Sequence, residues 1–319
     1  MIDNGMVNDI VVISILRVNS VATKIVLAKA LFNLLVRADV RKNLCDNDVL
    51  DALVRVSLAE SHPILQMIAG RAMYNLSCDM NIFASYLIEV EAIKLLIRQA
   101  TQEIRISEAQ KPLVLKTLVN VASHEETRKL LLDLPISEGL VRLSTDLRRT
   151  MKEEDLAYFA SIVLFQLSQE EDVAKIDEAD LIPLLVSLST VGNVQVKQLV
   201  MGSFVNLSLH AEFFPPLSES NTLAFAVDII ASGHFTYALR MDAAQLLLHL
   251  TSNYAPSRLA LLQRETISSF LSFLRVIQDE EDKAVLSRIL NEISKDDACC
   301  PLMIAGNALS MLLRLCKVE

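Results

Sequence analysis

Seven polar residues recur in this sequence at nearly equal intervals, each within an apolar stretch of helical character. Their separations are 42, 45, 46, 40, 43 and 42 residues. We call them the aligned positions: Asn33, Asn75, Asn120, Gln166, Asn206, His249 and Asn291. An asparagine amide offers two N–H donors and a carbonyl acceptor, so it can bond both the N–H and the C=O of a passing backbone. This chemistry predicts recognition of an extended chain.

A basic residue stands four positions before each of the first three aligned residues. These cations are Lys29, Arg71 and Lys116. Residues four apart share one face of a helix, so each cation should lie one turn before its asparagine. The later repeats have Ile162, Gly202, Gln245 and Ser287 there. Three neighbouring cations favour an acidic partner, and they contribute selectivity and association rate more than affinity.

Both features also have structural interpretations. Lys or Arg on a helix face is commonly solvated surface. Asparagine within stacked helices can bond a neighbouring repeat and maintain the curvature of the stack. Gln166 and His249 are weaker candidates for recognition than the five asparagines. Tyr237 and Arg240, near the start of a predicted long helix, are further candidates for lining the same surface.

The sequence lacks the residue combinations on which enzyme sites are built. It contains no G-x-x-x-x-G-K, G-x-S-x-G or H-E-x-x-H motif. Its five cysteines lack the spacing of metal ligands. They are Cys45, Cys78, Cys299, Cys300 and Cys316. We expect a non-enzymatic protein without metal or cofactor, and reduced thiols in a cytoplasmic or, alternatively, nuclear compartment.

Composition and charge narrow the class further. Hydrophobic residues make up 52 %, with only 7 glycines and 8 prolines in 319 residues, which favours helices over hairpins. Residues 124–319 carry 17 Lys and Arg against 27 Asp and Glu, whereas residues 1–123 carry 13 against 12. An acidic second part argues against nucleic-acid binding. No uncharged run, 181–196 included, is long and uninterrupted enough to span a membrane.

Between successive aligned positions, the same order of elements recurs. A short first helix, such as EETRKLLLDL (125–134) or APSRLALLQR (255–264), precedes an apolar second helix. A polar break follows, as in AESHP before Ile64 or TVGN before Val194, and starts the long third helix with the aligned residue. Second helices are predicted at 49–59, 92–101, 139–147, 181–190 and 267–277. The period and this order predict a helical-repeat array.

This organisation resembles the armadillo repeat. The sequence NLCDNDVLDALVRVSLAESHPILQMIAGRAMYNLS (43–77) follows the family's order of second helix, polar turn and third helix ending in Asn-Leu-Ser. The resemblance covers essentially the whole chain and implies an all-α, right-handed α-solenoid. Few glycines precede the second helices, with Gly5, Gly139 and Gly306 near the expected place, and Pro215-Pro216 interrupt one first helix. HEAT repeats are the nearest alternative and would give a similar solenoid.

The expected array is one domain, residues 1–319. Its approximate repeats are 1–39 (partial), 40–79, 80–124, 125–169, 170–210, 211–253, 254–296 and 297–319 (partial). Solenoids normally end in caps with a polar outer face, whereas this chain begins with Val11 and Ile13 and ends with Leu309, Met311 and Leu312. We therefore expect continuation of a longer array, or end-to-end self-association.

In the armadillo family, the third helices line a concave groove that holds an extended peptide, which implies this role for the aligned positions. Importin-α-like members have Trp four residues earlier and hold Lys-rich peptides. This chain has no Trp, and its basic residues there resemble β-catenin-type grooves, which favour acidic partners. Helices pack about 8–10 Å apart and an extended chain rises about 3.3 Å per residue, so one aligned residue would serve roughly every third partner residue.

The leading hypothesis is therefore a protein–protein interaction scaffold or adaptor that binds an extended, acidic segment of a partner. The alternative is a structural or regulatory segment of a larger cytoskeletal, axonemal or chaperone-type assembly without a free groove. A third hypothesis, small-molecule sensing, has no supporting residues.

Overall fold

The computed structural model describes residues 20–37, 53, 62–89, 92–101, 106, 110–145, 153–262 and 266–315, and they form helices and turns with no strand. The chain divides into two compact units, which we call the N-terminal unit (residues 1–176) and the C-terminal unit (residues 177–319). Val11, Ile13, Cys45, Cys316 and, apart from Leu53, the predicted helix at 49–59 lie outside the described residues.

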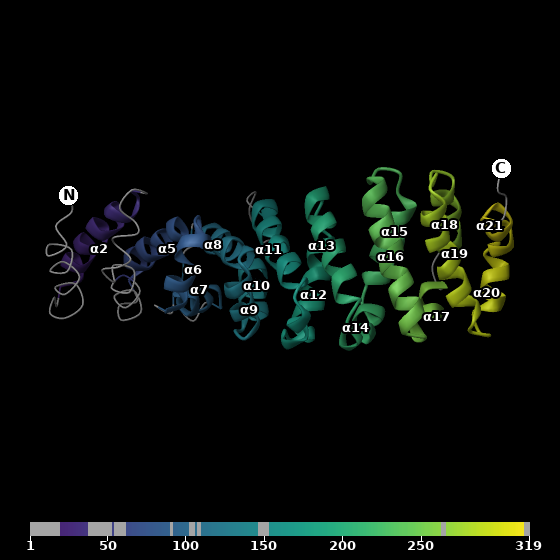
Figure 1. Cartoon of the computed structure of the whole chain (residues 1–319), viewed down its shortest axis with the longest axis horizontal. Coiled ribbons are helices and arrows are strands. Elements are labelled where there is room, and N and C mark those ends of the chain that lie inside the picture. The colour runs from purple at the N-terminus through teal and green to yellow at the C-terminus, as the bar shows by residue number, and fades with distance from the viewer. Residues whose placement is uncertain are drawn as a thin grey trace. The chain divides into compact units, whose positions relative to one another are not determined.

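The N-terminal unit is a stack of helices in the predicted order (Figure 1). Its third helices are α2 (Val21–Leu35), α5 (Pro63–Ser77), α8 (Lys111–Ser123) and α11 (Glu153–Leu167). Its first and second helices are α6 (Met80–Glu89), α7 (Ala92–Ala100), α9 (Glu125–Leu132) and α10 (Ile136–Thr145), followed by the 3₁₀ turn η2 (Glu171–Lys175). Helices of the same type pack against one another: α2 on α5, α5 on α8, α8 on α11, and α7 on α10.

The C-terminal unit repeats this arrangement. Its second helices are α12 (Glu178–Ser189), α15 (Thr222–Ala231), α18 (Thr266–Leu274) and α21 (Ala308–Leu315). Its third helices are α13 (Val194–Leu207), α16 (Tyr237–Asn253) and α19 (Glu280–Ser294). The first helices are η3 (Ala211–Phe213) with α14 (Phe214–Glu219), α17 (Pro256–Leu262) and α20 (Cys300–Ala305). Again α13 packs on α16, α16 on α19, and α15 on α18.

Local sequence signals start these helices as predicted. His62 caps α5 by accepting a hydrogen bond from the Ile64 N–H, and Pro63 occupies the first turn, where its missing N–H has no partner to lose. Asn193 caps α13 by accepting from two backbone N–H groups. The helix starts predicted from AESHP and TVGN are therefore confirmed.

Proline and glycine act differently from the sequence expectation at two places. Pro215-Pro216 do not simply break a first helix: η3 precedes them, and they lie in the first turn of α14, where proline is tolerated. Gly139 lies within α10 rather than before it. A Cβ at Gly139 would come within 2.9 Å of the Ala100 Cβ, so this glycine allows close packing of α10 on α7.

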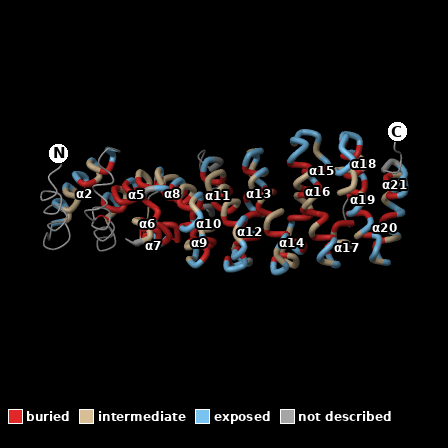
Figure 2. The backbone as a smooth tube through the Cα atoms, in the orientation of Figure 1, coloured by how far each residue is buried: buried red, intermediate tan, exposed pale blue. Residues whose placement is uncertain are grey.

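The core of each unit lies between the layers of helices (Figure 2). Leu, Ile, Val, Ala and Phe side chains supply it, and the buried faces of neighbouring helices repeat from one repeat to the next. Burial of these apolar faces is the main force that holds a helical stack together. The aligned residues lie on the third helices at the border of this core.

Candidate functional site

All seven aligned residues lie near the C-terminal ends of third helices. In the N-terminal unit they are Asn33 on α2, Asn75 on α5, Asn120 on α8 and Gln166 on α11. In the C-terminal unit they are Asn206 on α13, His249 on α16 and Asn291 on α19. Since helices of this type pack side by side, the aligned residues of each unit occupy equivalent places on neighbouring helices. None is fully buried; Asn33 and Asn291 are exposed and the others are half-buried.

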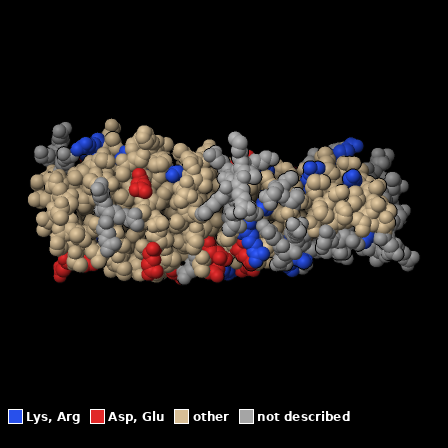
Figure 3. Space-filling view, turned by 180° about the vertical axis from the view of Figure 1, so that it is seen from behind, with Lys and Arg blue, Asp and Glu red and all other residues tan. Residues whose placement is uncertain are grey.

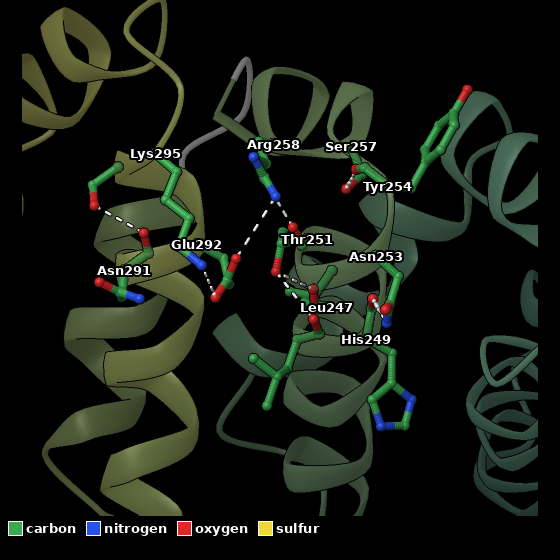
Figure 4. Close-up of polar contacts among 12 residues, drawn as sticks. Leu247, His249, Thr251, Asn253, Tyr254, Ser257, Arg258, Asn291, Glu292 and Lys295 are labelled. Atoms are coloured by element: carbon green, nitrogen blue, oxygen red, sulfur yellow. Dashed lines mark hydrogen bonds and ion pairs between the residues drawn. The ribbon is translucent and has the colours of Figure 1, made fainter. Parts of the chain in front are cut away.

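Three of the aligned amides are open. Among the described residues, the side chains of Asn33, Asn75 and Asn291 form no hydrogen bond. Figure 4 shows the Asn291 amide on α19 without a partner; only its backbone carbonyl accepts a bond, from the Ser294 hydroxyl. These amides keep both donors and the acceptor for another chain.

Asn120 links two helices. Its Nδ2 donates to the Ser77 hydroxyl at 3.1 Å and lies 3.8 Å from the Cys78 sulfur, while Ser77 donates to the Tyr74 carbonyl of α5. These contacts tie α8 to the end of α5. They lie beside a cavity of about 240 Å³. The carbonyl oxygen of the Asn120 amide takes no part in these bonds, so half of this amide is committed to the stack.

His249 is committed on both ring nitrogens. Its Nδ1 lies 2.8 Å from the Ser208 hydroxyl of α13, and its Nε2 lies 2.7 Å from the Gln245 amide nitrogen one turn earlier. The amide nitrogen can only donate, so Nε2 accepts and Nδ1–H donates to Ser208, which in turn donates to the Val205 carbonyl. Burial lowers the pKa of His249, in agreement with a neutral ring. This network joins α16 to α13.

The remaining two aligned residues are partly enclosed. Oε1 of Gln166 is buried and has no hydrogen-bond partner among the described residues. Asn206 is engaged by an interaction within the chain. Neither residue presents an open amide like that of Asn75.

The three cations lie where the sequence placed them. Lys29, Arg71 and Lys116 are exposed, and none makes an ion pair with a described residue. Lys116 extends toward the next third helix, with its Nζ 5.3 Å from the centre of the Phe159 ring of α11. At the equivalent positions, the later repeats carry no charge.

Arg240 does not line this surface, contrary to the sequence expectation. It is only 6 % exposed, and its Nε and Nη2 donate to the Ile230 carbonyl at 3.0 and 2.7 Å. Its guanidinium lies 4.1 Å from the centre of the Phe273 ring. Arg240 stands nine residues before His249, which at about 100° per residue is the opposite side of the helix. Tyr237 remains exposed at 41 %.

Sequence reasoning missed a structural arginine in the first helices. Arg128 of α9 donates through Nη1 to the Ala122 carbonyl at the end of α8 and pairs through Nε with Glu170. The cation therefore lies at the C-terminus of the preceding third helix, where the helix dipole favours it.

Arg258 of α17 repeats this contact in the C-terminal unit (Figure 4). Its Nε donates to the Thr251 carbonyl at 2.8 Å, and its Nη2 lies 3.7 Å from Glu292 of α19. The sequence contains a pattern that could have revealed this repeated arginine: Thr-Arg at 127–128 and Ser-Arg at 257–258 are about three repeat lengths apart.

Surface charge, metal-ligand clusters and membrane-spanning helices are three further signs of function that a structure can carry. Figure 3 shows one face, on which acidic side chains gather mostly along the lower edge and basic ones are scattered. Among the described residues, no group of three His, Cys, Asp or Glu residues could hold a metal ion. Over the same part of the chain, every helix is too short or too polar to cross a membrane.

Solved structures give the fold a counterpart. A computationally designed armadillo repeat protein for modular peptide recognition matches with a TM-score of 0.62 and 17 % identity, over 76 % of this chain and 99 % of the design. A designed armadillo repeat protein in complex with the peptide (KR)4 matches with a TM-score of 0.59 and 19 % identity, over 76 % and 99 %.

An engineered protein matches over 98 % of this chain and 84 % of its own, with a TM-score of 0.55 and 17 % identity. No protein-family model and no curated protein matches the sequence. At these identities the likeness concerns the fold, and the predicted all-α armadillo-type solenoid is confirmed.

Proposed function

Because the chain has the armadillo-repeat fold, we propose that its N-terminal unit is a protein-interaction scaffold whose third helices bind an extended, acidic segment of a partner. One observation carries the proposal. Lys29, Arg71 and Lys116 are exposed and without an ion pair among the described residues, each one turn before an aligned asparagine on neighbouring helices.

The two residue types divide the work. The open amides of Asn33 and Asn75 bond the backbone of the partner and are indifferent to its sequence. The cations one turn away select carboxylate side chains. The designed relative in complex with (KR)4 binds a basic peptide; three exposed cations would repel such a peptide here, so we expect the opposite charge preference.

The C-terminal unit favours a second role, which is the structural alternative. Its aligned residue His249 is held by Ser208 and Gln245, and no cation stands four residues before an aligned position. Side chains that bond one another leave fewer groups for a guest. We propose that this unit maintains the stack or contacts other components of an assembly.

A binding titration tests the main proposal. A fluorescein-labelled (Asp-Glu)4 peptide should bind the whole chain in an anisotropy titration, more weakly as ionic strength rises, while (Lys-Arg)4 should not bind. Charge reversal at Lys29, Arg71 and Lys116 to Glu should abolish binding. A matched triple reversal at Lys129, Arg275 and Lys295, which are also exposed, should have little effect.

The amides need their own variants. Asn33→Ala together with Asn75→Ala should weaken binding of the acidic peptide at least tenfold, or about 1.4 kcal/mol or more, with an unchanged circular dichroism spectrum. If the acidic peptide binds the charge-reversed protein as it binds the parent, the proposed surface is not the site.

A further inference from the structure

A cavity of about 340 Å³ lies in the C-terminal unit, between the successive first helices α14 and α17. Its walls come from the end of α14, the turn into α15 and the start of α17, and these three helices pack on one another. Figure 4 shows the Tyr254 side chain, just before α17, pointing away from Arg258 toward the preceding repeat, where this cavity lies. No aligned position lines it, because the aligned positions lie on third helices.

Ser218 gives this cavity a polar group that the fold leaves unused. The residue is only 8 % exposed, and its hydroxyl has no hydrogen-bond partner in the part of the chain that the structure describes. Burying a hydroxyl without a hydrogen bond costs free energy, which a bound donor would recover. The Ser218 hydroxyl is therefore suited to contact a guest in the cavity.

Two other first helices carry leucine at the equivalent place. The ends of α9, α14 and α17 contain the pairs Leu131-Leu132, Leu217-Ser218 and Leu261-Leu262, and the first member of each pair is fully buried. Leu132 and Leu262 bury apolar side chains there, at most 8 % exposed. The smaller, polar Ser218 leaves space where these repeats place a leucine, so the cavity follows from a departure from the repeat pattern.

Three further polar side chains of the cavity are free. Those of Glu219, Asn221 and Tyr254 form no hydrogen bond or ion pair with any residue that the structure describes. Glu219 is the only charged residue of the lining, while Leu223 and Ala260 supply an apolar side. The cavity thus offers oxygen acceptors, one negative charge and an aromatic ring, with no cation of its own to neutralise them.

A larger cavity in the same unit lacks this property. It measures about 590 Å³ and is lined by Tyr237, Asp279 and Asp282, among others. The Tyr237 hydroxyl donates to the Asp282 carboxylate, and the Asp279 side chain caps α19 by accepting from a backbone N–H. Its carboxylates are therefore already engaged within the fold.

We propose that the cavity between α14 and α17 binds the guanidinium group of an arginine side chain of a partner protein. A guanidinium carries a positive charge and five N–H donors, which match the Glu219 carboxylate and the oxygen atoms of Ser218 and Tyr254. An aromatic ring also attracts a cation, and a guanidinium is less strongly hydrated than an ammonium, so it enters a half-buried site more readily.

The size of the cavity suits one long side chain. About 340 Å³ is near the lower end of the range of roughly 300–1,000 Å³ for ligand sites. The methylene groups of an arginine would contact Leu223 and Ala260 while its head group reaches the polar wall. This site is independent of the third-helix surface and uses neither its amides nor its cations.

An NMR titration tests the proposal. The tripeptide acetyl-Gly-Arg-Gly-amide, added to the whole chain, should shift the methyl signals of Leu223 and Ala260. The same peptide with citrulline, which has the shape of arginine without its charge, should not shift them. Glu219→Gln should weaken binding at least about threefold. Ser218→Leu, which inserts the residue of α9 and α17, should abolish binding by filling the cavity.

Matched controls separate this site from others. Glu212→Gln removes another exposed carboxylate of the same repeat, outside the cavity, and should leave the titration unchanged. Charge reversal at Lys29, Arg71 and Lys116 should also leave it unchanged, so a failure of the third-helix surface is distinguishable from a failure here. Ser218→Ala should not lower the thermal unfolding temperature, because its hydroxyl has no partner to lose.

Three outcomes would overturn the proposal. The first is that the arginine peptide leaves the signals of Leu223 and Ala260 in place. The second is that the citrulline peptide, or the Glu219→Gln variant, binds as the parent pair does. The third is that agmatine, a free guanidinium compound, binds while the tripeptide does not, in which case the occupant is a small molecule rather than a partner protein.

Discussion

The N-terminal and C-terminal units use the same place in the repeat for different chemistry. In the N-terminal unit, Asn33 and Asn75 present open amides, and cations stand one turn before them. In the C-terminal unit, Asn291 also has an open amide, but His249 bonds Ser208 and Gln245, and no charged residue stands four positions before an aligned residue. Asn120 lies between these cases, because one half of its amide bonds Ser77.

The position of an aligned residue in the repeat therefore does not decide whether its side chain is open. The repeat places each aligned residue at the end of a third helix beside the next third helix. Whether the side chain is open depends on its neighbour on the preceding third helix. A serine two residues after the preceding aligned residue forms a hydrogen bond with the next aligned side chain: Ser77 bonds Asn120, and Ser208 bonds His249. For Asn75, the residue at the equivalent place, two after Asn33, is Leu35, and a leucine side chain has no hydrogen-bonding group.

The largest effect on stability should follow loss of Arg240. Arg240→Ala removes two hydrogen bonds to the Ile230 carbonyl and the contact with Phe273 from a buried place. We expect the free energy of unfolding to fall by about 2–4 kcal/mol in urea titrations. Lys111, also nine residues before its aligned residue, is buried in the N-terminal unit, so Lys111→Ala should be costly too. A loss below about 0.5 kcal/mol for Arg240→Ala would contradict the burial described here.

The two first-helix arginines compare the units directly. Arg128→Ala and Arg258→Ala should each cost about 1–3 kcal/mol, because each removes the arginine bond to a carbonyl near a helix end. Arg128→Ala also removes the ion pair of the half-buried Glu170, whereas Glu292 keeps its ion pair with Lys295. Double-mutant cycles with Glu170→Gln and Glu292→Gln should give the larger coupling for Arg128, which pairs directly, than for Arg258 at 3.7 Å. Equal coupling energies for the two pairs would contradict the expectation that the shorter distance gives the stronger interaction.

The pH dependence of stability should report on His249. Its pKa is lowered by burial from an ordinary value near 6.5, so between the two pKa values the unfolded chain binds more protons than the folded chain. The free energy of unfolding should therefore fall as pH is lowered from 7.5 through 6.5 and level off below the folded-state pKa. His249→Asn should flatten this part of the profile. An unchanged profile for His249→Asn would argue against the neutral ring.

The smallest expected effects are those of single amides. Asn120→Ala should reduce the free energy of unfolding by about 0.5–1.5 kcal/mol through the lost bond to Ser77. Asn75→Ala should have almost no effect on stability, because its amide is open. Chemical denaturation of both variants checks this order; a reversed order would place the structural role at Asn75.

Much of the fold was legible in the sequence because helix formation depends on near neighbours. The repeat length, the all-α class and the helix starts at His62 and Asn193 follow from N-cap residues and from the spacing of apolar residues along the chain. The position of Lys116 one turn before Asn120 needs only helix geometry. These features involve residues within a few positions of each other.

The stacking of helices decided the rest. Sequence spacing placed His249 and Asn291 in one class, yet one is held by Ser208 and the other is open. It suggested an accessible Arg240, which lies instead against Ile230 and is buried. These outcomes depend on side chains from neighbouring helices that lie ten to forty residues away, and only packing brings them within hydrogen-bond distance.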